Sequence, residues 1–221
     1  MWDCRRVDQR HATTFPPGFF TRSDEADDSD FYAFDRLVTH IDGGAIAAVG
    51  ELYNELGLCV ASSGPVLDIC SSWISHFPTK PERLVITGMN EAELAANDMA
   101  DERLVKDLNA DPVLPFADAA FAAVTCCVSV DYLIKPLDVF AEVRRVLQPD
   151  GMFVCTFSTR CFPTKAIRGW LATDDVGRCR IVETYFEITT GFDEPTTQLR
   201  NPGAPGDPLY AVSASRRITR S

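Results

Sequence analysis

Three side chains in this sequence have the chemistry to move a proton or orient a polar ligand beside an apolar segment. His76 follows an apolar run at 65–70, and Asp131 and Tyr132 follow another at 121–129. Histidine titrates near neutral pH, so it is the usual general base in proteins. We therefore take His76, Asp131 and Tyr132 as candidate catalytic residues.

Each of these candidates has a structural alternative. His76 suits a helix cap or a packing residue as well as a base, and both interpretations stay open. His40, a further histidine, fits packing better than catalysis. The rings of Trp73 and Tyr132 fit the walls of a pocket better than they fit chemical groups.

The elements that must position these side chains alternate along the chain. Short apolar runs of strand length occur at 65–70, 83–87, 103–108, 121–129 and 152–158. Helical spacing or helix-forming composition occurs at 44–58, 91–99, 136–148, 163–171 and 175–188. Strands that alternate with helices form right-handed βαβ units and a parallel sheet with both faces covered.

Two further strand-like runs, 196–201 and 209–215, lack a helix between them that is long enough for a parallel return. They predict an antiparallel hairpin. The expected fold is a Rossmann-like, doubly wound, seven-stranded and mostly parallel sheet that ends in this hairpin. We expect this domain to span 43–221, after a partly disordered segment 1–42 whose aromatic part, 31–42, forms a lid.

Composition narrows the range of functions. The 221 residues suit one compact domain, and the net charge of −11 argues against a general affinity for nucleic acid. No apolar run reaches the ~20 residues that span a bilayer, so we expect no membrane partner. The eight cysteines and three histidines lack the spacing of a zinc site, so we expect no metal. The protein is expected in the cytoplasm, or in a plastid if its basic N-terminus is the remnant of a transit peptide.

In a sheet of this kind, ligands bind beyond the carboxyl ends of the strands, at the point where the strand order reverses. The sequence places a site at 68–77, 88–91, 107–109 and 129–132. Polar or small residues that could contact a ligand occur in each of these segments. They are Asp68, Cys70, Ser71, Ser72, Asn90, Glu91, Asp107, Leu108 and Ser129.

The segment 103–151 carries the most specific pattern. It contains an acidic residue at Asp107, then 114–116 as Leu-Pro-Phe, and later 145–151 as Arg-Val-Leu-Gln-Pro-Asp-Gly. Here the chain resembles the type 11 class of S-adenosylmethionine-dependent methyltransferases, a class I family, over roughly 65–215. It departs from that pattern at Ala122 and Asp150. The wider sequence also resembles an uncharacterised methyltransferase-like group of cyanobacteria and photosynthetic eukaryotes.

The resemblance implies S-adenosylmethionine as the cofactor and gives roles to particular positions. Asp107 would accept a hydrogen bond from the adenine amino group, with the backbone of Leu108 beside the ring. The alternative is that Asp107 caps a turn before Asn109. The ribose position falls on Asn90, or on Glu91 as its replacement.

The first loop departs from the family. The expected glycines of D-x-G-x-G-x-G are replaced by Cys70, Ser72 and Ile74, after Asp68. Ser71 and Ser72 would bond the methionine carboxylate, and Asp68 its amino group. Alternatively, the loop is closed and the protein is a non-catalytic descendant.

The sequence therefore predicts methyl transfer to a small, apolar or aromatic acceptor. The rival from another class is a methyltransferase-fold protein that binds a ligand or a partner without catalysis. A nicotinamide-dependent dehydrogenase is a weak third interpretation, because no G-x-G-x-x-G follows the first predicted strand. The acceptor and the oligomeric state stay undetermined.

Overall fold

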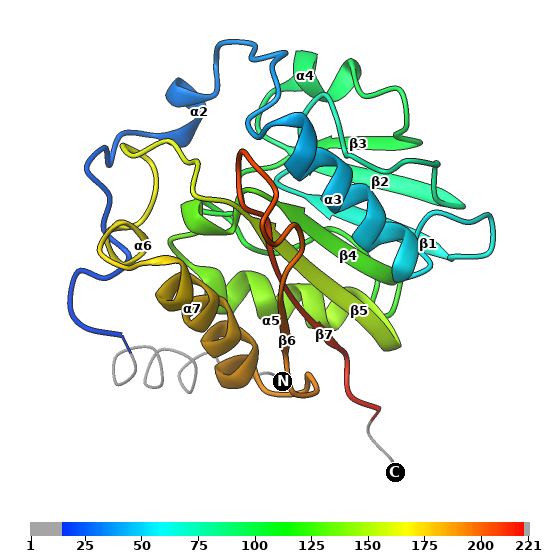
Figure 1. Cartoon of the computed structure of the whole chain (residues 1–221). Helices are drawn as coiled ribbons and strands as arrows, with labels where there is room; N and C mark the ends of the chain where they lie inside the picture. Colours follow the sequence, from blue (N-terminus) through cyan, green and yellow to red (C-terminus); the bar gives the residue numbers. More distant parts are fainter. Residues whose placement is uncertain (1–14, 219–221) are drawn as a thin grey trace.

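Seven strands form one mixed sheet in the computed structural model, which describes residues 15–218 (Figure 1). Their order is β3-β2-β1-β4-β5-β7-β6, and β7 runs antiparallel to both of its neighbours. The strands are β1 (Pro65–Ile69), β2 (Arg83–Gly88), β3 (Glu102–Val105), β4 (Phe121–Cys127), β5 (Leu147–Phe157), β6 (Thr196–Leu199) and β7 (Tyr210–Ser215). The predicted seven-stranded Rossmann-like sheet and its C-terminal antiparallel hairpin are confirmed.

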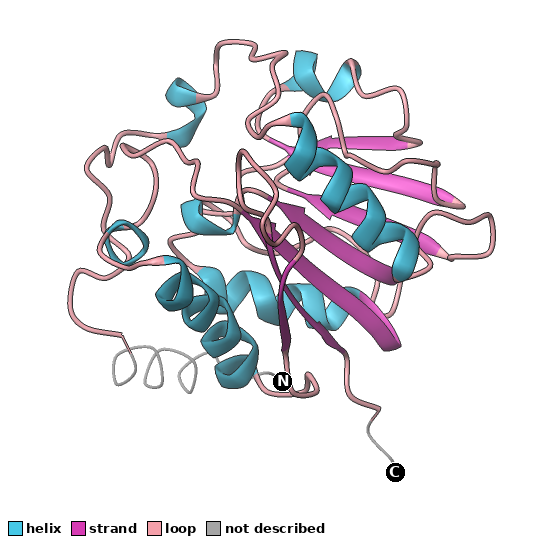
Figure 2. Ribbon diagram, in the orientation of Figure 1, coloured by secondary structure: helices cyan, strands magenta, loops and turns pink. Residues whose placement is uncertain are grey.

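Helices cover both faces of the sheet (Figure 2). They are α2 (Asp28–Phe31), α3 (Gly43–Glu55), α4 (Glu91–Ala95), the 3-10 turn η1 (Val130–Tyr132), α5 (Pro136–Val146), α6 (Arg168–Leu171) and α7 (Asp175–Thr189). Successive strand residues point to opposite faces, so each face has its own apolar core. One core packs α5 and α7 against Leu67 and Phe153, and the other packs α3 against Val66 and Val154.

The connection from β1 to β2 contains no helix. Residues 70–82 run as a loop, in which Pro78 and Pro81 do not favour helix continuation. Phe77 fastens this loop to the core, because its ring stacks on Tyr53 of α3 at 4.6 Å. The helix α3, which precedes β1, therefore covers the face above this strand.

The segment predicted as a helix at 163–171 is helical only at α6. Before it, the backbone N–H groups of Lys165 and Ala166 both bond to the carbonyl of Phe162 in a turn. The chain is then tied to the N-terminal segment, since Arg168 N–H bonds to Thr21 O at 2.7 Å. These long-range contacts, absent from the local pattern, shorten the helix.

Residues 15–30 pack on the rest of the domain. Phe15 is buried beside Tyr185, with ring centroids 5.7 Å apart. Asp28 is only 6% exposed. Residues 1–14 lie outside the described part of the chain. Within that part, no helix is long and apolar enough to cross a membrane.

Candidate functional site

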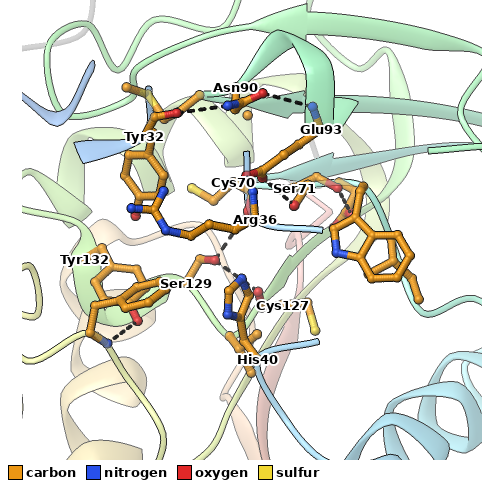
Figure 3. A pocket seen from close by; sticks show the side chains of 18 of the residues that line it. Tyr32, Arg36, His40, Cys70, Ser71, Asn90, Glu93, Cys127, Ser129 and Tyr132 are labelled. Carbon is orange, nitrogen blue, oxygen red and sulfur yellow. Dashed lines mark hydrogen bonds between the residues drawn. The ribbon is translucent and has the colours of Figure 1, made fainter. Parts of the chain in front are cut away.

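The carboxyl ends of β1, β2, β3 and β4 meet at a cavity of about 320 Å³ (Figure 3). This volume lies at the lower end of the range for small-molecule sites. Most of the predicted cofactor-binding residues line it. They are Asp68, Cys70, Ser71, Ser72, Asn90, Asp107, Leu108 and Ser129. The structure thus brings together residues from four separate segments, at the place where such sheets bind ligands.

Asp68, the last residue but one of β1, is a buried carboxyl group without a cationic partner in the described part of the chain. Its Oδ2 accepts a hydrogen bond from Ser71 Oγ at 2.6 Å, and its Oδ1 accepts one from Thr125 Oγ1 at 2.6 Å. Burial raises the pKa of Asp68 to about 6, although these hydroxyl donors oppose the rise. At neutral pH the group is mostly ionised and suited to a ligand cation.

The backbone keeps the left-handed conformation that a glycine would adopt at the first altered position. Cys70 has φ 53°, and Val128, which follows β4, has φ 46°. For a β-branched valine such a φ is an outlier, with a typical cost of about 1–3 kcal/mol. Both residues line the cavity. Although cysteine replaces glycine at position 70, the chain still makes the left-handed turn that places the backbone of the loop after β1 at the cavity.

The loop after β1 also passes directly over the end of β2. Ser71 N–H bonds to Thr87 O at 2.7 Å. A Cβ at Gly88 would lie 2.2 Å from the carbonyl oxygen of Ser71. Gly88 is thus the glycine that this loop needs, because it allows two backbones to approach closely.

At the start of α4, Asn90 contacts the N-terminal segment. Its Oδ1 caps the helix by accepting from Glu93 N–H at 2.9 Å. Its Nδ2 donates to Tyr32 O at 3.0 Å and to Asp35 Oδ1 at 2.9 Å. The amide is thus committed on both sides, and a ribose hydroxyl would compete with these contacts.

Glu93, which the sequence analysis missed, takes the place expected for Glu91. Glu91 borders a separate shallow hollow outside the cavity. Glu93 lines the cavity, with Oε2 accepting from Ser72 Oγ and Oε1 from Arg36 N–H, each at 2.6 Å. The spacing of Asn90 and Glu93, typical of a helix N-terminus, would have indicated which glutamate turns inward.

Asp107 caps a turn and also lies at the cavity wall. Its Oδ1 accepts from the N–H groups of Asn109 and Ala110 at 2.8 and 3.1 Å, so it caps the turn after β3. It also lines the cavity beside Leu108. Capping by one oxygen leaves the carboxylate at the cavity wall.

The three candidate catalytic residues differ in their position relative to the cavity. His76 lines the cavity, and burial lowers its pKa to about 4; its Nδ1 has no hydrogen-bond partner among the described residues. Tyr132 also lines the cavity, but its hydroxyl accepts from Phe162 N–H at 2.8 Å, and burial raises its pKa well above the usual value. Asp131 is buried and does not line the cavity; burial raises its pKa to about 7. The tight turn of η1 directs these two adjacent side chains to different sides, that of Tyr132 to the cavity and that of Asp131 to the interior.

The N-terminal segment forms the wall that faces the strand ends. Tyr32, Arg36 and His40 line the cavity, and Figure 3 shows the side chain of Arg36 directed toward the ring of Tyr32. The guanidinium also lies over the ring of Phe31, 4.5 Å from its centroid. The sequence did not predict Arg36 as a site residue. The only feature of the sequence that could have indicated it is its position within the aromatic segment 31–42.

A buried group of ions holds this segment in place. Asp28 pairs with Arg22 at 2.8 Å and with Lys165 at 3.1 Å. All three side chains are buried, with exposed fractions of 6% for Asp28, 5% for Arg22 and 1% for Lys165. Asn109 Nδ2 donates to the same carboxylate at 2.9 Å. We call these four residues the ion latch. It joins the N-terminal segment to the end of β3 and to the loop before α6.

Residues 74–155 match the model of a family described as a methyltransferase domain. The fold is that of the class I S-adenosylmethionine-dependent methyltransferases. A methyltransferase from Aquifex aeolicus superposes with a TM-score of 0.54 at 12% identity, over 98% of this chain and all of that one. The PH0226 protein of Pyrococcus horikoshii gives 0.55 at 17% identity, over 85% of this chain and 99% of that one.

Phosphoethanolamine N-methyltransferase 2 of Haemonchus contortus, solved with S-adenosyl-L-methionine, gives a TM-score of 0.52 at 11% identity. The similarity covers 78% of this chain and 57% of that one. No curated protein sequence matches this chain. At these identities the solved structures establish the methyltransferase fold, and the acceptor has to be argued from the site.

Proposed function

We propose that this methyltransferase-fold protein binds S-adenosylmethionine and transfers its methyl group to a small-molecule acceptor. The convergence of residues that follow four strands on one cavity supports this most strongly. The cavity lies at the carboxyl edge of the sheet, where folds of this class bind ligands. The left-handed backbone at Cys70 further supports a cofactor loop that works without its usual glycines.

The residues present fit the cofactor. The buried, unpaired carboxylate of Asp68 suits the ammonium group, and the hydroxyls of Ser71 and Ser72 suit the carboxylate of the same methionine moiety. Glu93 and Asn90 lie on the ribose side, and Asp107 lies toward the adenine. In the proposed site, Glu93 replaces the residue that the family pattern placed at position 90 or 91.

When bound, the cofactor supplies a methyl group on a sulfonium, which a nucleophile takes by in-line displacement. Such a reaction needs mainly the positioning of its two partners. His76 is neutral at pH 7, because its lowered pKa disfavours the imidazolium, so it is able to accept a proton from an acceptor hydroxyl. Tyr132 contributes a wall, and Asp131, which is buried outside the cavity, takes no direct part.

Calorimetric titration of the full chain with S-adenosylmethionine and S-adenosylhomocysteine tests the proposal. We expect saturable binding that Asp107→Ala weakens at least about tenfold, the magnitude of one lost hydrogen bond to a charged group. Asp107→Asn is the matched variant. Its amide oxygen still caps Asn109, but its amide NH2 is a donor and cannot accept a hydrogen bond from the adenine amino group. If only Asp107→Ala weakens binding, Asp107 is a turn cap and does not read adenine.

Cofactor affinity is expected to rise with pH from about 5 to about 7. The ammonium group, whose pKa is near 7.7–8.0, stays charged in this range, while Asp68 ionises through its pKa of about 6. Each pH unit below 6 should weaken binding by up to about tenfold. Titrations in a pH series check this, and Asp68→Asn should bind weakly with no such slope.

The ionisation of Asp68 should also make the free energy of unfolding depend on pH, with the opposite sign to the dependence of cofactor affinity. Folded Asp68 retains its proton to about pH 6, whereas the unfolded group releases it near its model value of 3.8. The folded state therefore binds more protons between these values, and the stability of the wild type relative to Asp68→Asn falls as pH rises from about 4 to 6. Urea denaturation across this window measures it.

The rival function is ligand or partner binding without catalysis. Two observations favour it: the connection from β1 to β2 lacks a helix whose N-terminus would bind the cofactor carboxylate, and Tyr32 and Asp35 engage the amide of Asn90. Absence of binding at millimolar cofactor in the titration above would select this rival.

A further inference from the structure

The cavity has two chemically different walls. The wall of strand ends carries the carboxylates Asp68, Glu93 and Asp107, which suit the positive ammonium and the polar groups of the proposed cofactor. The opposite wall comes from the N-terminal segment, η1 and the loop after β5. It carries arginines and flat rings, namely Tyr32, Arg36, His40, Tyr132, Arg160 and Phe162.

The two arginines of this opposite wall lack close carboxylate partners. Among residues 15–218, Arg36 forms no ion pair, and its guanidinium donates only to the carbonyls of Phe31 and Phe34 at 2.7 and 3.1 Å. Arg160, 62% exposed, has a carboxylate only at 3.8 Å, in Asp207. The Oδ2 of Asp207 already accepts from Asp42 N–H at 3.0 Å.

The other charged groups near this wall do not cancel the two arginines. Asp28 is compensated by Arg22 and Lys165 in the ion latch. Lys106 is paired with Asp111. Burial lowers the pKa of His40 below its usual value, so this imidazole is mostly neutral at pH 7. The wall therefore has an excess of positive charge that faces the cavity.

The shape of the wall is set by aromatic rings. The ring of Phe162 lies 5.3 Å from that of Phe31, 5.3 Å from that of His40 and 5.9 Å from that of Tyr132, centroid to centroid. Such rings offer flat apolar surface, with favourable offset or edge contacts for another ring. A guanidinium stacked on a ring has its N–H groups in the ring-parallel plane, and each terminal nitrogen of Arg36 keeps a second N–H beside the one that bonds to a carbonyl.

We propose that the acceptor is a planar aromatic acid, with its ring against Phe162 and Tyr132 and its carboxylate held by Arg36 and Arg160. This inference rests on the proposed function, since it assigns the other wall to the cofactor. It also narrows the acceptor, because amines and neutral aromatic compounds would leave Arg36 without an anion and Arg160 with only the carboxylate of Asp207, at 3.8 Å. Arg36 and Arg160 are then residues that determine specificity.

Benzoate is the probe, titrated by calorimetry into the full chain with and without S-adenosylhomocysteine. We expect saturable binding of benzoate, at least about tenfold weaker binding of neutral benzamide, and none of benzylamine. Arg160→Gln should weaken benzoate binding at least about fivefold. Arg180→Gln is the matched control, because Arg180 on α7 is equally exposed, at 62%, and lies outside the cavity.

Any of three results overturns the inference. The first is equal binding of benzoate and benzamide, the second is equal affinity of Arg160→Gln and Arg180→Gln for benzoate, and the third is no binding of benzoate. Arg36→Gln gives a second check, because glutamine keeps donors for the carbonyl of Phe31 while removing the charge. Cofactor titration without benzoate separates the two proposals. If cofactor binds and benzoate does not, only the acceptor assignment fails. If benzoate binds with the expected pattern and cofactor does not, the proposed methyl transfer fails and the anion site stands.

Discussion

Asp28→Asn is expected to lower the free energy of unfolding by about 3–5 kcal/mol. The substitution keeps the shape of the side chain but leaves Arg22, at 5% exposure, buried without its carboxylate. Lys165, at 1% exposure, keeps only Asp24 as an acidic partner, at 3.2 Å. An uncompensated buried charge costs far more than the pair itself contributes. Urea denaturation, followed by circular dichroism, measures the change.

Glu187→Gln is the control for that prediction. Glu187 pairs with Arg180 on α7, where the two side chains are 43% and 62% exposed, so its loss should cost under about 1 kcal/mol. If Asp28→Asn costs no more than Glu187→Gln, the ion latch does not stabilise the fold. The latch also holds Tyr32 and Arg36 at the cavity, so Asp28→Asn should weaken cofactor binding under conditions where the protein remains folded.

The latch is a better test of the proposed lid than removal of residues 1–42. Such a deletion would take Phe15 and Ile41 from the two apolar cores, since both are buried. Weak binding by the shortened chain would then reflect damage to the fold as well as loss of the lid. A substitution in the latch leaves both cores intact.

Gly88→Ala is expected to lower stability by about 1–3 kcal/mol and to abolish measurable cofactor binding. The added methyl group would lie 2.2 Å from Ser71 O and 3.0 Å from Leu94 Cδ2. Because Ser71 O is backbone, the whole loop after Asp68 has to move away from the strand ends. Calorimetric titration with the cofactor, beside urea denaturation of the same variant, separates the two effects.

Gly43→Ala is the matched control, because a Cβ at Gly43 would meet no atom within 4 Å. Gly43 begins α3, and alanine favours a helix over glycine by up to about 1 kcal/mol, so this variant should be as stable as the wild type or more so. Normal cofactor binding by Gly88→Ala would show that the loop adjusts and that the close approach is not required.

The mostly parallel sheet, its final hairpin and the edge at which the candidate site lies could be predicted from local pattern. Apolar runs of strand length, separated by helical spacing, specify a parallel sheet, and the missing crossover helix after 196–201 specifies the final hairpin. Because the carboxyl ends of parallel strands share one edge, Asp68 and Asp107 had to lie near each other. These conclusions need only the periodicity of neighbouring residues.

The orientation of single side chains was decided by tertiary structure. Glu91 and Glu93 differ little in sequence, but only Glu93 is directed into the cavity by Ser72 and Arg36. In the same way, η1 turns Tyr132 to the cavity and buries Asp131. A short helix rotates successive side chains by a large angle, so the phase of the turn matters more than the residue type.

The wall opposite the strand ends depends on contacts between distant parts of the chain. Asp28 is paired with Lys165, which is far along the sequence and lies beside it only in the fold. Likewise, Arg36 is positioned by the hydrogen bond of its backbone N–H to Glu93, and the preceding residue, Asp35, by its bond to Asn90. The sequence by itself determined the sheet and the edge at which the candidate site lies, because those follow from local periodicity. The tertiary structure decided which charges are buried, paired or directed into the cavity, because burial and pairing arise only when separate segments meet.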